Sequence, residues 1–447
     1  MATRLTGRKA EGYWRDEGVK REVLVVAHDR VGQAMAGPGI RAVELARALA
    51  EHHSVRLAAP VGSEPVDSGM PFFEFDGARG ATIDAALEGT EVVVTDPLPP
   101  AVARRIPDGS RRWLVDLYNP EPFEGLEAHR LGRGAVHRRI LDVVRTDRLL
   151  FAAQTGSAFL CANDRQRDMW LGFLAAERRL GSARYDTDPE GRHLIEVVPF
   201  GVPTEPPRRG PPLLRGELFS EDARILLWSG GLWDWLDPLT VLRALTILRE
   251  ADERWVCAFI GTVRPVGGTH FKTGERAVRL ADELGLTAQG AVRFVDWLPY
   301  SERAGPLLEA DAAICAHFRT METRFAVRTR LFDAVWAGLP IVSTDGDHWS
   351  DLVRAHGLGE IAPPEQPEAL AAAAQKVVKR GREHYAPALE ALAEEHRWPR
   401  VAAPLARLID GAAGLPAAAA PLGARLLTAR HSTAQQVHRF WRRLGRD

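Results

Sequence analysis

Charged side chains are dense between Met321 and Asp347, and their types could do chemistry on a phosphate. Five of them fall within twelve positions: Glu322, Arg324, Arg328, Arg330 and Asp333. A guanidinium can donate two parallel hydrogen bonds to a phosphate, and the free N–H groups of a helix N-terminus favour the same anion. The alternative is a surface ion pair between Arg330 and Asp333, which would contribute only about 0.3 to 0.5 kcal/mol.

The stretch that carries these charges is predicted to be one helix, followed by a turn and a buried strand. Its apolar residues recur at helical spacing on one face: Val327, Leu331, Ala334, Val335 and Gly338. Gly338 suits the left-handed end of a helix, and Pro340 prevents the helix from continuing. Residues 341–343 are then predicted to form a strand.

Two glycine loops follow predicted strands and could bring backbone amides close to a phosphate. The first ends at Gly37 and Gly39, and the second contains Gly230 and Gly231. The alternative for the first loop is a glycine turn without a ligand. Its spacing is not GxGxxG, and the strand that ends near Pro60 lacks the acidic residue that would bind a dinucleotide ribose, so we do not expect NAD.

Aromatic and acidic residues follow the second glycine loop. Trp228, Trp233 and Trp235 would form a wall of a cleft, with a place in the core as the alternative for Trp228. Asp237 is expected to cap the next helix, with Pro238 at its first position.

No metal site is expected. Asp345-Gly346-Asp347 has the spacing of a metal-binding Asp-x-Asp pair, but Asp-Gly is first of all a turn signal. The sequence has no P-loop, no HExxH, no GxSxG and no Cys/His zinc spacing. We therefore expect neither a metal nor a cofactor.

The elements that position these residues alternate between strand and helix, which predicts an α/β fold of two Rossmann-like, doubly wound domains that face a cleft. The expected divisions are a flexible arm at 1–21, a first domain at 22–198, a Pro-rich linker at 199–217, a second domain at 218–380 and C-terminal helices at 381–447. Ligands of such sheets bind outside the carboxyl ends of the strands, so function is expected in the cleft.

The bulk composition excludes several classes of partner. The chain has 447 residues and a net charge of -1, which gives no general attraction to nucleic acid. Cys161, Cys257 and Cys315 lie in apolar runs and are expected to be buried, reduced thiols. The N-terminus lacks the apolar segment of a signal peptide and no stretch is long enough to span a bilayer, so we expect a cytoplasmic protein. The sequence indicates no oligomeric state.

The segment 425–446 is predicted to be a basic amphipathic helix. Its apolar face carries Val437, Phe440, Trp441 and Leu444, and four arginines lie opposite. Such a helix can pack against the protein, or it can make a peripheral contact with an anionic membrane.

Three motifs in this order resemble the GT-B glycosyltransferases of the retaining family 4 type, in a divergent and actinobacterial-like form. They are the glycine loop and helix start at 37–46, the stretch Val197-Val198-Pro199-Phe200-Gly201-Val202 at the domain junction, and the segment 333–340. The resemblance implies transfer of a sugar from a nucleotide-diphosphate sugar to a hydroxyl of a saccharide or small-molecule acceptor, without a metal. It also implies that the donor binds mainly to the second domain and the acceptor mainly to the first.

The resemblance assigns roles in the charged stretch, with departures. Asp333 stands where the family has a glutamate that binds the ribose, and Glu322 is the nearest substitute for a second glutamate, which would fall on Phe325. The family's phosphate-binding Arg and Lys would fall on Gly231 and Asp237. We therefore hypothesise that Arg328 and Arg330 replace that missing pair at the diphosphate.

On the acceptor side, the resemblance points to the strand ends of the first domain. Relatives place a histidine near Asp116, where this chain offers Tyr118 and Asn119, and His28 follows the first strand. Asp116 is either a general base for the acceptor hydroxyl or a structural hydrogen-bond acceptor at a strand end. Two alternatives to transfer stay open, namely a sugar-nucleotide epimerase on the same fold and a catalytically degenerate protein that only binds.

Overall fold

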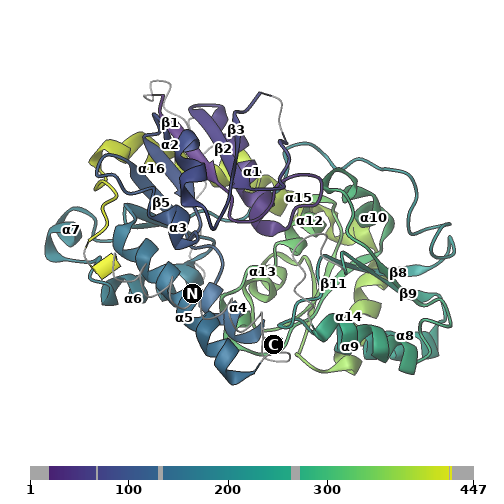
Figure 1. The fold of residues 1–447 in the computed structure, drawn as a ribbon. Coiled ribbons are helices and arrows are strands. Elements are labelled where there is room, and N and C mark those ends of the chain that lie inside the picture. Colours follow the sequence, from purple (N-terminus) through teal and green to yellow (C-terminus); the bar gives the residue numbers. More distant parts are fainter. Residues whose placement is uncertain (1–19, 67–68, 129–133, 263–271, 422, 425–447) are drawn as a thin grey trace.

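The computed structural model describes residues 20–66, 69–128, 134–262, 272–421, 423 and 424 (Figure 1). The predicted amphipathic segment 425–446 lies outside the described residues, and so does all of the expected N-terminal arm except Lys20 and Arg21. In the described part of the chain, no helix is both long enough and apolar enough to cross a bilayer.

The first domain is built on a parallel sheet whose strand order is β3-β2-β1-β4-β5-β6-β7. The strands are β1 (Glu22–Val26), β2 (Ser54–Pro60), β3 (Phe72–Phe75), β4 (Val92–Thr95), β5 (Arg112–Asp116), β6 (Ala158–Cys161) and β7 (Ile195–Val197). The central strands β4 and β6 are fully buried, as expected for runs of apolar residues covered on both faces.

Helices cover both faces of this sheet. They are α1 (Gly37–Ala50), α2 (Asp84–Leu87), α3 (Pro100–Ala103), α4 (Glu121–Glu127), α5 (Ala135–Thr155), α6 (Asp164–Ala176) and α7 (Ser182–Thr187), with a 3-10 turn at Gly80–Ile83. The helix α1 begins directly at the first glycine loop, with Pro38 in its first turn. This places the helix start beside the carboxyl end of β1.

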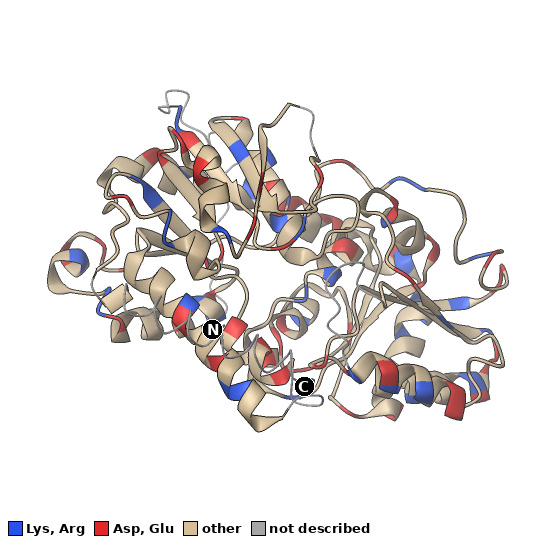
Figure 2. Cartoon of the chain, viewed as in Figure 1, with Lys and Arg blue, Asp and Glu red and all other residues tan. Residues whose placement is uncertain are grey.

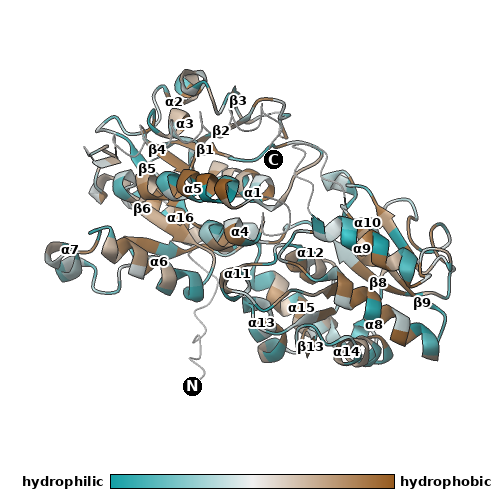
Figure 3. Cartoon of the chain, turned by 60° about the horizontal axis from the view of Figure 1, so that its bottom comes forward, coloured by the Kyte–Doolittle hydropathy of each residue, from teal (hydrophilic) through white to brown (hydrophobic). Residues whose placement is uncertain are grey.

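The second domain repeats the design with the strand order β10-β9-β8-β11-β12-β13, again all parallel. The strands are β8 (Arg224–Ser229), β9 (Trp255–Ile260), β10 (Val292–Val295), β11 (Ala312–Cys315), β12 (Ile341–Thr344) and β13 (Gly359–Ala362). The helices are α8 (Pro238–Ala251), α9 (Lys272–Glu283), α10 (Ala304–Glu309), α11 (Met321–Phe325), α12 (Arg330–Trp336), α13 (His348–His356) and α14 (Pro367–Arg380), and a 3-10 turn lies at Tyr300–Glu302. The hydropathy colouring shows apolar strands between helices with mixed surfaces (Figure 3).

The chain then crosses back to the first domain. Helix α15 (Arg382–Glu395) packs against α12 and α14, whereas α16 (Trp398–Asp410) packs against α1 and β7. The outgoing and returning segments run side by side, because Val202 N–H donates to the His396 carbonyl at 2.7 Å and Trp398 N–H donates to the Val202 carbonyl at 3.1 Å. Figure 1 shows the yellow-green α16 among the purple and blue elements of the first domain.

The prediction of one helix after Met321 is wrong. The structure has two short helices, α11 and α12, separated by residues 326–329. Thr320 caps α11, and the chain then becomes extended at Ala326. In a continuous helix, residues six apart would point about 120° away from each other. The break instead lets Glu322 and Arg328 meet face to face.

Other local predictions are confirmed. Gly338 adopts a left-handed conformation with φ of 61° after α12, and β12 follows. The Asp237 carboxylate accepts a hydrogen bond from the Thr240 N–H at 3.0 Å, which caps α8. All three cysteines are buried and free.

Candidate active site between the two domains

Three adjoining cavities lie along the cleft, where the carboxyl ends of the strands of both sheets meet. The loop cavity lies between the two glycine loops, the central cavity follows it, and the first-domain cavity lies over β4 and β5. The loop and central cavities share Ala36, Gly37, Trp233, Thr329 and Arg330 as lining residues. The central and first-domain cavities share His28, Asn119, Glu124 and Trp235. Because neighbouring cavities share walls, the three cavities form one continuous row from the second domain to the first.

The two glycine loops approach each other across the loop cavity. A Cβ atom on Gly37 would lie 2.9 Å from the Thr329 hydroxyl of the second domain, so the start of α1 reaches that domain only because Gly37 has no side chain. Gly230 has a φ of 101°, a conformation that favours glycine. Gly230 and Gly231 line the loop cavity, whereas Gly39 is buried against the carbonyl of Arg30 and lines none of these three cavities.

Arg330 lies at the boundary of the loop and central cavities. Its guanidinium donates to the Gly231 carbonyl at 2.8 Å and to the Gly230 carbonyl at 3.4 Å, and it lies 5.1 Å from the centre of the Trp228 ring. Trp228 itself is fully buried. It therefore lies in the core, which was the alternative to a place in the cleft wall. Burial lowers the pKa of Arg330 to about 10, so the group is still charged at neutral pH.

Arg328 faces a different partner. Its two terminal nitrogens donate to the two carboxylate oxygens of Glu322 at 2.6 and 2.7 Å, and both side chains are buried. Burial opposes the charge, but the Glu322 carboxylate raises the pKa of Arg328. Arg328 lines the central cavity, whereas Glu322 lines none of the three cavities and is held by this pair.

Asp333 does not pair with Arg330, so the surface ion pair that the sequence offered as an alternative is not formed. Its carboxylate instead accepts a hydrogen bond at 3.2 Å from Nε of Arg303, whose guanidinium stacks over the rings of Tyr300 and Trp336. Asp333 lines the loop cavity beside Trp297. Burial raises the pKa of Asp333, and the Arg303 charge opposes that rise.

On the first-domain side, Asp116 is held by Arg41. The Arg41 guanidinium donates to both carboxylate oxygens, at 2.6 and 3.1 Å, and also to the carbonyls of Val198 and Pro199 at 2.9 Å each. Tyr118 is buried, with its ring centre 4.9 Å from the Arg41 guanidinium. These contacts tie the end of β5 to the domain junction, which is the structural role that the sequence left open for Asp116.

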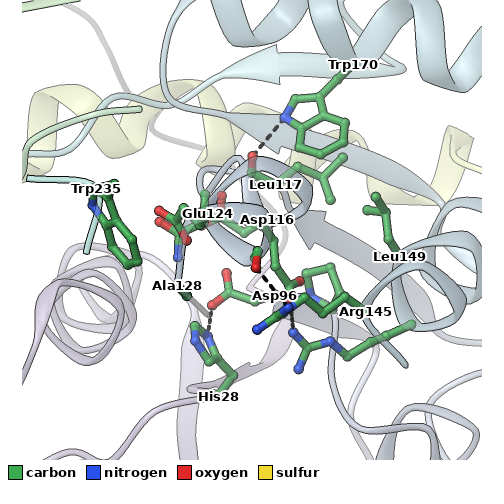
Figure 4. A pocket seen from close by; sticks show the side chains of 15 residues that line it. His28, Asp96, Asp116, Leu117, Glu124, Ala128, Arg145, Leu149, Trp170 and Trp235 are labelled. Atoms are coloured by element: carbon green, nitrogen blue, oxygen red, sulfur yellow. Dashed lines mark hydrogen bonds and ion pairs between the residues drawn. The ribbon is translucent and has the colours of Figure 1, made fainter. Parts of the chain in front are cut away.

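His28 and Asp96 form a pair at the ends of β1 and β4. The imidazole Nδ1 bonds the Asp96 carboxylate, and His28 lines both the central and the first-domain cavities (Figure 4). Burial lowers the pKa of His28, but the Asp96 carboxylate outweighs burial and raises it above its ordinary value. Asn119 lines the same two cavities.

Comparison with known proteins identifies the fold. A family model described as glycosyl transferases group 1 matches residues 223–380, which is the second domain. A sucrose-phosphate synthase from Thermosynechococcus elongatus superimposes with a TM-score of 0.61 and 13% identity, over 88% of this chain and 100% of that one. The chain has the GT-B fold.

Two further GT-B structures agree with this result. The Anabaena protein Alr3699/HepE, in complex with UDP and glucose, has a TM-score of 0.61 and 13% identity over 87% of this chain and 99% of that one. A glycosyltransferase from Rickettsia africae has a TM-score of 0.57 and 15% identity over 88% and 98% of the two chains. No curated protein sequence matches the chain. At these identities the likeness establishes the fold alone.

The GT-B cleft thus brings together most of the residues that the sequence singled out. Gly37, Gly230, Gly231, Arg330 and Asp333 line the loop cavity, and His28, Asn119 and Asp116 line the first-domain cavity. Asp345 and Asp347 lie at the end of β12 in structural roles, because Asp345 pairs with Arg354 at 2.6 Å and Asp347 caps α13 through the Ser350 N–H at 2.8 Å.

Sequence reasoning missed Asp96, Glu124 and Arg303, which line the cavities, and Arg41, which holds Asp116 from behind. Asp96 directly follows β4, so the rule that ligands bind at strand ends could have found it. Arg41 and Arg303 act through partners distant in sequence, and no local pattern signals them. Glu124 follows a proline-rich turn and lies on the short helix α4, which was not predicted.

Proposed function

We propose that this chain is a glycosyltransferase that moves a sugar from a nucleotide-diphosphate sugar to a hydroxyl of a saccharide or small-molecule acceptor. The observation that carries the proposal is Arg330, a half-buried cation at the boundary of two cavities. Among the described residues, no carboxylate pairs with it, and its protein contacts are two carbonyl oxygens and a tryptophan ring. A charge that is partly withdrawn from water and has only neutral protein partners is costly, so the geometry favours a bound anion at this point.

A diphosphate beside Arg330 would extend in two directions. Toward the second domain, the loop cavity offers the apolar Trp297 and Leu298 for a nucleotide base, and Asp333 for the ribose hydroxyls. Among the described residues, only one Asp333 oxygen has a partner, Arg303, so the carboxylate retains acceptor capacity for a hydroxyl. The start of α1 at Gly37 adds backbone N–H groups on the other side of the phosphates.

Toward the first domain, the central cavity would hold the transferred sugar and the first-domain cavity the acceptor. Both are rich in hydrogen-bonding side chains, including His28 and Asn119. The structures of Alr3699/HepE with UDP and glucose, and with UDP-glucose, show that a protein of the same fold binds such ligands. This supports the uridine nucleotides as the first donors to test here.

Arg328 has a modified role in this proposal. Both of its terminal nitrogens already bind Glu322, so neither is free to donate to a phosphate. The pair instead forms a rigid wall of the central cavity. We assign the diphosphate to Arg330, and we assign Glu322 the task of holding Arg328 in place.

Retention of the anomeric configuration is part of the proposal. Both carboxylate oxygens of Asp116 already accept hydrogen bonds from Arg41, which disfavours Asp116 as a general base for an inverting displacement. An NMR analysis of the product anomer tests this point. A product with inverted configuration would exclude it.

A ligand screen tests the function itself. Thermal unfolding is measured with UDP, GDP, dTDP and their sugars, since a ligand at 100 times its dissociation constant adds about 2.7 kcal/mol of stability. The donor that binds is then incubated with a panel of monosaccharides, alkyl glycosides and sugar phosphates, and product is detected by mass spectrometry. An epimerised nucleotide sugar without acceptor would favour the epimerase, and tight binding with no transfer would favour a protein that only binds.

A further inference from the structure

The position of Glu124 is not explained by the fold. It lies on α4 at the wall shared by the central and first-domain cavities, so it faces the place where the two substrates of a transfer would meet. Figure 4 shows its carboxyl in the same cavity as the His28 and Asp96 pair and Trp235. No described residue forms a hydrogen bond or ion pair with this carboxyl.

The other carboxylates of the first-domain cavity all have partners. Asp116 binds Arg41, Asp96 binds His28, and Glu121 pairs with Arg148. Each of these three carboxylates is thus explained by its ion pair. Glu124 has none within the described residues, and an ionised carboxyl turned into a cavity needs either water or a ligand as its donor.

Helix α4 is held firmly at the domain interface, which fixes where Glu124 points. Phe123, the preceding residue, stacks on Phe325 of the second domain with ring centres 5.4 Å apart and planes 19° apart. On helix α6 of the first domain, Gln166 donates to the carbonyls of Tyr118 and Phe325 at 2.6 and 2.8 Å. The Glu124 carboxyl is therefore carried by a segment that both domains position.

We propose that Glu124 binds the acceptor hydroxyl at the point of transfer and orients it toward the donor sugar. This inference rests on the proposed glycosyltransferase function. The carboxylate accepts a hydrogen bond from the hydroxyl while that oxygen approaches the sugar. This task differs from the general-base role that was considered for Asp116. The bond from the sugar to the diphosphate breaks as the bond to the acceptor oxygen forms, and the hydroxyl proton passes to the leaving diphosphate. The carboxylate therefore positions the oxygen and needs no strong basicity.

The electrostatic surroundings make this contact sensitive to pH. Burial raises the pKa of Glu124 to about 7, the Glu322 carboxylate adds to the rise, and the charges of Arg328, His28 and Arg145 oppose it. These four groups face Glu124 from α11, from the loop before α12, from the loop after β1 and from α5. The ionised form accepts the stronger hydrogen bond, so acceptor use is expected to increase as the pH rises through about 7.

The test compares Glu124→Gln with Glu127→Gln, a carboxyl on the same helix that lines none of the three cavities. With the donor and acceptor that the wild-type protein uses in the panel, Glu124→Gln should lower kcat/KM for the acceptor by about tenfold to a hundredfold. The dissociation constant of UDP should stay within about twofold, since Glu124 lies outside the loop cavity. The increase of kcat/KM with pH near 7 should disappear in Glu124→Gln and persist in Glu127→Gln.

Two outcomes overturn the inference. One is a Glu124→Gln protein with wild-type kcat/KM for the acceptor and the wild-type pH profile, and the other is a loss that Glu127→Gln shares. Failure of the proposed function looks different, because the wild-type protein would then transfer no sugar. Glutamine has the shape of glutamate and removes no partner of a described residue, so the variant is expected to fold. Circular dichroism and UDP binding verify this.

Discussion

Glu322 and Arg328 form a buried, two-pronged ion pair across the break between α11 and α12, with N–O distances of 2.6 and 2.7 Å. The two residues are six apart in the sequence, so the pair can close only because the helix is interrupted. It sets the path of residues 326–329 and with them the place where α12 begins. Arg330 is the first residue of α12, so the buried pair fixes the position of the side chain that we propose binds the diphosphate.

Breaking this pair should be costly. Glu322→Gln leaves the Arg328 charge buried without its carboxylate and is expected to lower the free energy of unfolding by about 3 to 5 kcal/mol. The double variant Glu322→Gln with Arg328→Met removes both charges and should recover part of that loss. Urea unfolding of the wild type, both single variants and the double variant measures the coupling. A coupling near zero would contradict the structural role.

Arg330→Ala tests the diphosphate site. Removal of a preorganised charge contact to the leaving diphosphate should cost about 3 kcal/mol, or roughly a hundredfold in turnover, and should also weaken UDP binding. Arg324→Ala is the matched control, because Arg324 is exposed on α11 and lines none of the three cavities. Unchanged turnover and UDP affinity in a folded Arg330→Ala protein would rule out this assignment.

The contact between Gly37 and Thr329 should limit closure of the cleft. Gly37→Ala places a Cβ atom 2.9 Å from the Thr329 hydroxyl, so the domains must separate slightly and UDP affinity should fall by about tenfold. The double variant with Thr329→Ala removes that hydroxyl and should restore most of the affinity. Isothermal titration with UDP gives both values, and equal affinities for wild type and Gly37→Ala would show that the close approach is unimportant.

A chelator should leave transfer unchanged. The only Asp-x-Asp pair singled out in the sequence is engaged, with Asp345 bound to Arg354 and Asp347 capping α13. Initial rates are compared with and without EDTA, and then with added Mg²⁺ or Mn²⁺. A rate that falls with EDTA and returns with metal would contradict metal independence.

The His28 and Asp96 pair should make stability depend on pH. The pKa of His28 is raised in the folded state above its unfolded value near 6.5, so the folded protein binds more protons in this range. The stabilisation is complete below pH 6.5 and is lost as the pH rises through the folded-state pKa. Asp96→Asn removes the carboxylate and should flatten this decline. Urea unfolding between pH 5.5 and 8.5 checks the sign, and equal slopes in both proteins would disprove it.

The two parallel sheets were predicted well because their inner strands are apolar runs, as in residues 92–95 and 312–315. Such runs are stable only when both faces of the sheet are covered. It missed β7 and β13, which are short and lie at the edges of their sheets. A glutamate interrupts the short apolar run of each, Glu196 in β7 and Glu360 in β13, so neither shows a clear period.

The candidate site was predicted less completely, for a physical reason. Glycines and strand ends carry local signals, and these located Gly37, Gly230 and His28 in the cleft. Ion pairs form between residues whose separation in sequence is arbitrary, as for Arg303 with Asp333 and Arg41 with Asp116. No periodicity encodes such partners. The sequence therefore indicated which side chains face the cleft, but not which of their charges are paired with another residue of the protein.

The return of the chain to the first domain has a consequence for synthesis on the ribosome. Helix α1 is among the first elements to emerge, but its partner α16 begins only at Trp398. At typical translation rates of roughly 5 to 20 residues per second, the apolar face of α1 stays uncovered for some tens of seconds until α16 is synthesised. During that interval this apolar face of the nascent first domain is exposed and open to chaperones. Chimeras that exchange first domains between relatives should carry residues 398–410 with them.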